Sequence, residues 1–169
     1  MDELVTPRLR LRRARLEDID ALHAVFSDAR AMRYWSTPPH ETRDRTRAWL
    51  EEMIAASPQQ SCDFVVERDG VAIGKAGCWR APEIGFIIGP AHWGQGLARE
   101  ALTAAIPAIF AQLPIPALTA DVDPRNAASL SLLARVGFTE TGRATRTWQV
   151  GDEWCDSVYL TLPRPRRAA

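Results

Sequence analysis

The sequence is poor in several features, and each scarcity excludes a class of protein. Lys75 is the single lysine, and the 21 basic residues are matched by 21 acidic ones, which gives a formal net charge of zero. A chain without excess positive charge lacks the electrostatic footprint of proteins that bind nucleic acid or anionic membranes nonspecifically. We therefore expect neither nucleic acid nor a membrane as a partner.

Cysteine is equally scarce. The three cysteines, Cys62, Cys78 and Cys155, are far apart and form no CxxC pair, so the sequence predicts neither a disulfide framework nor a zinc site. No apolar run reaches the roughly 18 residues of a membrane span, and residues 1–15 lack the apolar centre of a secretory signal. These absences predict a cytoplasmic protein without a bound metal.

The length and composition that remain are those of one globular domain. The chain has 169 residues, of which 46% are hydrophobic and 25% charged. At this length roughly 70% of the surface of the unfolded chain can be buried, so a core forms without covalent crosslinks. We expect a single domain over residues 1–169, with the proline-rich and arginine-rich residues 163–169 as a frayed end.

Hydrophobic periodicity predicts a mixed α/β fold. Spacing of three to four residues predicts four helices, over residues 17–28, 42–56, 94–112 and 126–136. Alternation predicts about seven strands, over residues 8–12, 63–68, 71–79, 83–89, 118–122, 139–150 and 154–162. Pro107 should kink the third helix or shorten its last turn. The prolines after Trp35 place this aromatic residue on a loop, where it could contact a ligand or simply be buried.

Residues 84–98 carry the most informative pattern, a strand followed by a glycine-bearing loop and the start of a helix. Gly94 and Gly96 would let the backbone approach a phosphate, and the free N–H groups of the helix would face it. Arg99 stands where a dinucleotide-binding turn would have its third glycine, and a lysine does not follow Gly96 as in a Walker loop. The pattern therefore predicts an anion cradle of another type, or a tight turn without a ligand.

A second strand-to-helix unit follows, with Asn126, Ser129 and a closing Gly137-Phe138. Together with HWGQGLAREAL and the final hairpin WCDSVYLTL, this unit resembles the GNAT superfamily of acyl-CoA-dependent N-acetyltransferases. The resemblance runs from Thr6 to Leu162, and the opening TPRLRLRR is similar to the Rim-type branch, which acetylates protein N-termini. It implies a single GNAT-like domain with a mostly antiparallel twisted sheet.

The resemblance also implies the ligands and their contacts. Acetyl-CoA would be the co-substrate, and a primary amine of a protein N-terminus would be the acceptor. In the family, the loop holds the CoA pyrophosphate through backbone N–H groups and the preceding strand pairs with the pantetheine arm. The matching residues here are Phe86, Ile87, Ile88, Gly94, Gln95, Gly96, Leu97, Ala98, Arg99 and Asn126.

One departure from the family concerns the general acid. Many relatives carry a tyrosine seven residues after the asparagine, to protonate the departing thiolate, whereas this chain has Leu133. Rim-type relatives can present a serine instead, and Ser129 matches that position. Ser129 could equally brace the backbone after an Asn126 cap. Loss of the tyrosine leaves a non-catalytic acyl-CoA-binding regulatory domain as an alternative function.

Acetyl transfer to an amine needs only a weak base and a weak acid, because the amine and thiol pKa values lie near ~8 and ~8.5. Glu83, at the start of a strand, is the first candidate for the base, acting through water, although a solvated strand end would explain it too. Asp156 could orient the substrate ammonium, and Trp35 is the best candidate for the acceptor site. A small-molecule amine is an alternative acceptor, and a monomer or a homodimer fits the sequence.

Overall fold

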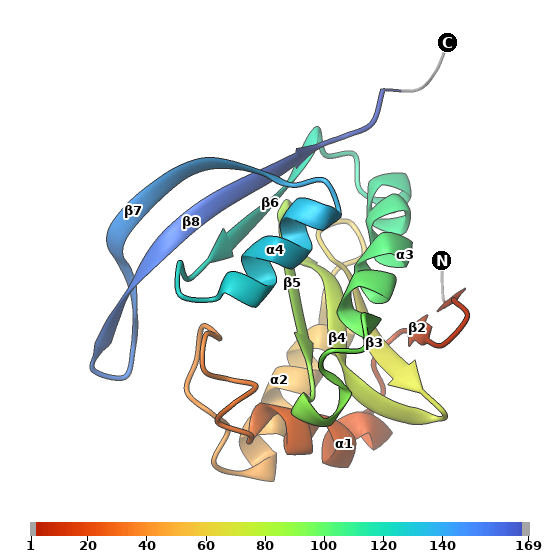
Figure 1. The fold of residues 1–169 in the computed structure, drawn as a ribbon. Coiled ribbons are helices and arrows are strands. Elements are labelled where there is room, and N and C mark those ends of the chain that lie inside the picture. Colours follow the sequence, from red (N-terminus) through yellow and green to blue (C-terminus); the bar gives the residue numbers. More distant parts are fainter. Residues whose placement is uncertain (1–2, 167–169) are drawn as a thin grey trace.

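One continuous sheet of eight strands organises residues 3–166, the part of the chain that the computed structural model describes (Figure 1). The strands lie in the order β1-β2-β3-β4-β5-β6-β8-β7, and every neighbouring pair is antiparallel except β5 and β6. Their bounds are β1 Glu3–Val5, β2 Arg10–Arg12, β3 Cys62–Arg68, β4 Val71–Arg80, β5 Glu83–Ile88, β6 Ala117–Val122, β7 Thr139–Val150 and β8 Glu153–Pro163.

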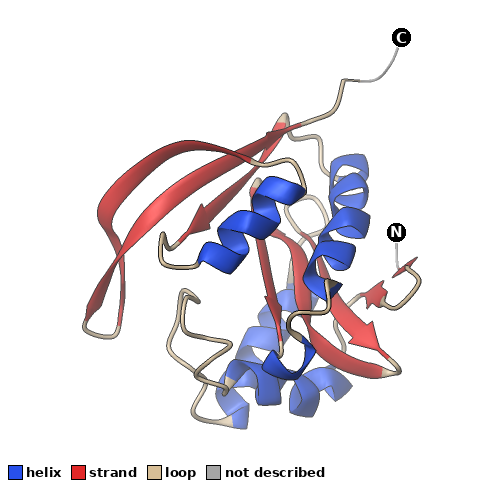
Figure 2. Cartoon of the chain, in the orientation of Figure 1, coloured by secondary structure: helices blue, strands red, loops and turns tan. Residues whose placement is uncertain are grey.

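Helices cover both faces of this sheet (Figure 2). They are α1 Ile19–Phe26, α2 Arg43–Ala55, α3 Leu97–Gln112 and α4 Ala127–Arg135, with single 3-10 turns at Leu16–Asp18 and Pro90–His92. Neighbouring residues of a strand point to opposite faces. Val65 and Ile87 accordingly pack with α1 and α2, whereas Val66 and Ile88 pack in the cluster that contains α3.

The predicted α/β fold is confirmed, with one strand more than expected. β1 was not predicted because it has three residues and pairs only with β2. The third helix begins at Leu97 rather than at residue 94, since Gly94 and Gly96 have φ values of 70° and 74°, which a right-handed helix does not allow. None of the helices within residues 3–166 is long and apolar enough to cross a membrane.

Pro107 does not shorten α3, so of the two effects predicted for this proline the shortened last turn is wrong and the kink stays a prediction. The helix continues past Pro107 to Gln112. A proline removes one helical hydrogen bond, at a cost of about 3 kcal/mol or more. The surrounding turns are held against the sheet because Ala105, Ile106 and Ile109 are buried in the main core cluster, and this burial offsets the lost bond.

The predicted frayed end is wrong for its first residues. β8 includes Pro163, and the guanidinium of Arg164 donates to the carbonyl oxygens of Phe110 at 2.7 Å and Ile115 at 2.8 Å, and to that of Leu113. These carbonyls lie at the end of α3 and in the connection that follows it, where no intrahelical donor reaches them. The rest of the expected tail, residues 167–169, lies outside the described residues.

Candidate active site

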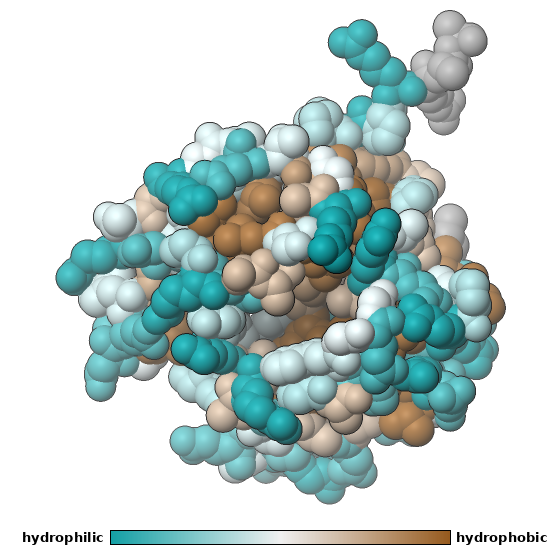
Figure 3. All heavy atoms as spheres, viewed as in Figure 1, coloured by the Kyte–Doolittle hydropathy of each residue, from teal (hydrophilic) through white to brown (hydrophobic). Residues whose placement is uncertain are grey.

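The two parallel strands at the centre of the sheet separate soon after they meet. β5 and β6 share one ladder pair, Glu83 with Thr119. Beyond this pair the strands line a cavity of about 1050 Å³, together with loop 29–35, residues of the loop before α3, and α4. Figure 3 shows the hollow in the middle of this face, with hydrophobic surface inside it. A ligand can therefore enter between the strands.

The loop before α3 has the geometry of an anion cradle. Gly94 and Gly96 are both left-handed, and a Cβ on Gly94 would meet no atom within 4 Å. Gly96 is the N-cap of α3 and offers no capping side chain, so the first-turn N–H groups have no intrahelical acceptor. An open concave backbone at the positive end of a helix fits a pyrophosphate.

Side chains behind the loop hold it in this shape. Arg8 donates to the carbonyl of Gln95 at 2.9 Å, Arg68 donates to its side-chain oxygen at 2.7 Å, and the Trp93 indole donates to the carbonyl of Ile88 at 2.7 Å. Gln95 is thus engaged by Arg68 and is not among the residues that line the cavity. The other residues assigned to the cofactor from the sequence all line it.

α4 presents Ser129 to the same cavity. The side-chain oxygen of Asn126 accepts the N–H of Ser129 at 3.1 Å and so caps the helix. Ser129 therefore stabilises the start of the helix through its backbone N–H. Its hydroxyl forms no hydrogen bond with another residue in the described range 3–166. Leu133, one turn later, is fully buried and also lines the cavity. Ser129 therefore presents a free hydroxyl to the cavity, whereas Leu133 has no group that could donate a proton.

Two carboxylates flank the point where the strands separate. Burial raises the pKa of Glu83, the charge of Asp121 raises it further, and a hydrogen bond from the Trp79 side chain opposes the rise. Burial also raises the pKa of Asp121, against a hydrogen bond from Ser157. Asp121 lines the cavity, whereas Glu83 lies at its closed end and is not part of the lining.

Asp121 was not predicted as a site residue, although the sequence carries a signal for it. Residues 118–122 alternate, and Leu118, Ala120 and Val122 are buried in the α3 side of the core. Asp121 must then point to the opposite face, toward α1 and α2. A carboxylate on that face of a central strand was the sign of a polar site.

A buried ion pair lies on this same face. Lys75 Nζ is 2.8 Å from Asp63 Oδ2, and the two side chains are 2% and 5% exposed. Asp63 Oδ1 has no hydrogen-bond partner in the described structure. Burial raises the pKa of Asp63, and the charge of Lys75 opposes this. The ammonium lies 5.9 Å from the centre of the Trp35 ring and would be 3.6 Å from a Cβ on Gly85.

Loop 29–35 forms the wall opposite β5 and β6. Trp35 lines the cavity and packs edge-on against Phe26, with ring centres 5.8 Å apart. Tyr34 lines it too, and two guanidinium groups lie over its ring, that of Arg33 at 5.1 Å and that of Arg125 at 5.7 Å. Trp35 was predicted to lie on a loop, but these arginines were not singled out, and Arg125 is distant from Tyr34 along the chain.

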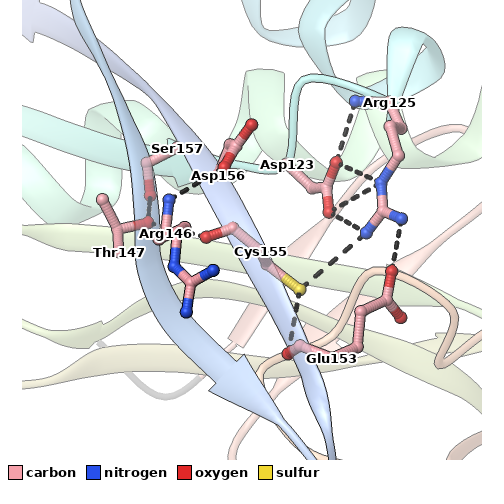
Figure 4. Close-up of polar contacts among 8 residues, drawn as sticks. All are labelled: Asp123, Arg125, Arg146, Thr147, Glu153, Cys155, Asp156 and Ser157. Carbon is pink, nitrogen blue, oxygen red and sulfur yellow. Dashed lines mark hydrogen bonds and ion pairs between the residues drawn. The ribbon is translucent and has the colours of Figure 1, made fainter.

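Arg125 contacts loop 29–35 through the Tyr34 ring and also binds residues at the end of β6 and in β8. Figure 4 shows the contacts with Asp123 and Glu153. The Arg125 guanidinium donates to both carboxylate oxygens of buried Asp123, at 2.9 Å and 2.6 Å, and to Glu153 at 2.5 Å. Hydrogen bonding from Arg125 lowers the pKa of Asp123. Asp123 is therefore neutralised as a charge, although it lines the cavity.

Asp156 lies in the β7–β8 hairpin and is not among the residues that line the cavity. Its side-chain oxygen accepts the N–H of Arg146 at 2.8 Å, where φ is 51° and the β7–β8 register shifts (Figure 4). The structure gives Asp156 a partner within the hairpin. Within residues 3–166, no group of three or more His, Cys, Asp or Glu side chains is arranged to hold a metal ion.

Comparison with known proteins identifies the architecture. The Acetyltransferase (GNAT) domain family matches residues 8–139. The uncharacterized N-acetyltransferase p20 of Bacillus licheniformis is 31% identical over 84% of this chain and 85% of its own. Escherichia coli spermidine N(1)-acetyltransferase is 26% identical over 91% and 85%. The E. coli [ribosomal protein uS5]-alanine N-acetyltransferase is 37% identical over 53% and 46%.

Solved structures share the fold. An acetyl transferase from Salmonella typhimurium that modifies the N-terminal serine of ribosomal protein L7/L12 matches with a TM-score of 0.84 and 17% identity, over 96% of this chain and 98% of its own. The yncA protein from the same species, solved with its cofactor acetyl-CoA, matches with a TM-score of 0.74 and 24% identity, over 95% and 96%. At these identities the likeness shows the fold alone.

Proposed function

The chain belongs to the GNAT family of N-acetyltransferases and uses acetyl-CoA, and from that premise we propose that its acceptor is the free amino terminus of a protein or peptide. The observation that carries the proposal is the extent of the cavity, whose lining runs from the glycine cradle, past Asp121 at the strand fork, to the aromatic loop 29–35. An extended peptide end can enter on the loop side while the cofactor occupies the cradle side. Similarity to the E. coli [ribosomal protein uS5]-alanine N-acetyltransferase over about half of this chain supports this acceptor.

Acetyl-CoA would be held by backbone more than by side chains. Gly94, Gly96 and the first turn of α3 would bind the pyrophosphate, with Arg99 beside it, and the edge of β5 that faces the cavity would bind the extended arm. Asn126 would keep α4 in place over the arm. When bound, acetyl-CoA supplies an acetyl thioester within reach of the amine.

Glu83 would take the proton that the ammonium must lose before attack, directly or through water. Burial raises its pKa, which makes its carboxylate a stronger base than a solvated one. Asp121, on the neighbouring strand, would hold the ammonium beside it. As the amine nitrogen bonds to the acetyl carbon, it releases its second proton to water, and as the carbon–sulfur bond breaks the Ser129 hydroxyl would donate its proton to the sulfur and recover one from solvent.

A thiol-release assay tests this acceptor. Peptides that begin with alanine or serine should release CoA thiol from acetyl-CoA and gain one acetyl group by mass, whereas the same peptides with a blocked N-terminus should not. Spermidine is the small amine to compare, because a spermidine acetyltransferase aligns over 91% of this chain. Turnover of spermidine with none of any peptide would refute the proposed acceptor.

A further inference from the structure

Arginines dominate the charge of the cavity wall. Its charged lining residues are Arg30, Arg33, Arg99, Arg135, Asp121 and Asp123. Arg99 lies on α3 and Arg135 on α4, whereas Arg30 and Arg33 lie on loop 29–35. In Figure 1 this loop lies beneath the amino end of α4, and Arg125 contacts it there through Tyr34. Arg30 and Arg33 are thus on the side where the acceptor would enter.

The arginines around this entrance differ in what already binds them. Arg30 is paired with Asp28, at 2.7 Å and 3.1 Å. Arg125 binds Asp123 and Glu153. Arg33 is exposed and forms no ion pair within 4 Å of a carboxylate in the described part of the chain. Its guanidinium lies over the Tyr34 ring, and its charge helps to lower the pKa of Asp123, which Arg125 already binds. Of these three arginines at the entrance, Arg33 is therefore the one whose guanidinium is not already bound by a carboxylate.

The surroundings of Arg33 also restrict what can bind. The guanidinium groups of Arg33 and Arg125 both lie over the Tyr34 ring, at 5.1 Å and 5.7 Å from its centre, and this cation–π contact favours a position of Arg33 beside the cavity wall. The nearby carboxylates Asp28, Asp123 and Glu153 are each neutralised by an arginine. A polyamine acceptor carries a second ammonium, which beside Tyr34 would face the Arg33 cation, while the three nearby carboxylates are already bound by arginines. A carboxylate would meet a planar donor that can bind it in bidentate geometry.

We infer that the preferred acceptor carries a carboxylate close to its amine, and that Arg33 selects it. The inference rests on the proposed function, because it assumes that the amine reaches the strand fork while its neighbouring group lies at loop 29–35. The carboxylate can come from an acidic second residue of a peptide or from the α-carboxylate of a free amino acid.

Matched acceptor pairs test the inference and separate these sources. One pair is a peptide beginning Ala-Asp against the same peptide beginning Ala-Asn, and the other is alanine against alaninamide. For the carboxylate member of at least one pair we expect kcat/KM to be about twofold to fivefold higher at low salt, as for one exposed arginine–carboxylate contact. The pair that shows the preference identifies the source.

Two variants assign the effect to one side chain. Arg33→Gln should abolish the preference, whereas Arg30→Gln, which removes the same charge from the same loop but from an arginine already bound by Asp28, should keep it. Equal kcat/KM within both pairs, or a preference that survives in Arg33→Gln, overturns the inference and leaves the proposed function intact.

Failure of the proposed function gives a different result, namely no acetylation of any acceptor. In that case titration calorimetry of the CoA complex with both matched pairs still decides the inference. Tighter binding of the carboxylate member of either pair that is lost in Arg33→Gln sustains it, and equal binding within both pairs overturns it.

Discussion

Replacement of Lys75 by methionine should destabilise the fold strongly. The Asp63–Lys75 pair is 2.8 Å apart and almost fully buried, and Asp63 Oδ1 already lacks a partner. Removal of one member of such a pair leaves an uncompensated buried charge and costs about 3–5 kcal/mol. In a domain of this size 1 kcal/mol corresponds to about 2–4 °C in Tm, so Lys75→Met should lower Tm by about 6–20 °C.

The loss should depend on pH in a defined direction. Burial raises the pKa of Asp63, and without the opposing charge of Lys75 the rise must be larger. A carboxyl whose folded pKa exceeds its unfolded value of about 3.9 destabilises the fold increasingly as pH rises above that value. The difference in unfolding free energy between Lys75→Met and the wild type should therefore be larger at pH 8 than at pH 5.

Urea unfolding of four proteins measures this directly. The set is the wild type, Lys75→Met, Asp63→Leu and the double variant, in which both charges are replaced by apolar side chains. The double variant should be within about 2 kcal/mol of the wild type, since apolar replacements of a buried pair are often neutral or stabilising. It also keeps the experiment decisive if a single variant does not fold. A cost below about 1 kcal/mol for Lys75→Met, or one independent of pH, would refute the reasoning.

Three further predictions concern the site. Gly96→Val should weaken CoA binding, measured by calorimetry, by about tenfold or more, and should lower the unfolding free energy by about 1–2 kcal/mol because valine is strained in left-handed backbone. Gly70→Val is the control: Gly70 is also left-handed, at φ 80°, so this variant should lose stability but bind CoA normally. Glu83→Gln should lower kcat/KM most below about pH 8, where the amine is charged, and a ratio to wild type that is constant between pH 6 and 9 would contradict a role as base. Ser129→Ala should lower kcat about tenfold to a hundredfold, ~1.4–2.7 kcal/mol, with unchanged CoA affinity; normal kcat with a lower Tm would leave Ser129 a structural residue.

Local patterns in the sequence were sufficient for the elements and for the cradle. Alternation at 118–122 and the helical spacing at 126–136 predicted β6 and α4 within two residues of their ends. Gly94 and Gly96 marked the loop because left-handed backbone is a local requirement. The fork between β5 and β6 was out of reach, since the number of ladder pairs between two strands depends on how the sheet twists and packs.

The pairing of Asp63 with Lys75 shows why side-chain contacts were harder to predict than elements. In the β3–β4 register Asp63 lies opposite Gly77, and Lys75 lies opposite Val65. The two charges are therefore diagonal neighbours, which meet because Gly77 leaves the space empty. A Cβ there would lie 2.8 Å from Asp63 Oδ1. Neither the register nor this gap can be read from spacing along the chain.

The single rung that joins β5 to β6 has a mechanical consequence. Elsewhere the sheet is joined by antiparallel ladders, so moving those strands apart means breaking backbone hydrogen bonds. Beyond Glu83 and Thr119 no ladder pair has to break when the two strands move apart. The sheet therefore opens most easily between β5 and β6, which is also where a ligand would enter. The fork can widen for a bulkier acyl chain while both flanking parts of the sheet stay intact.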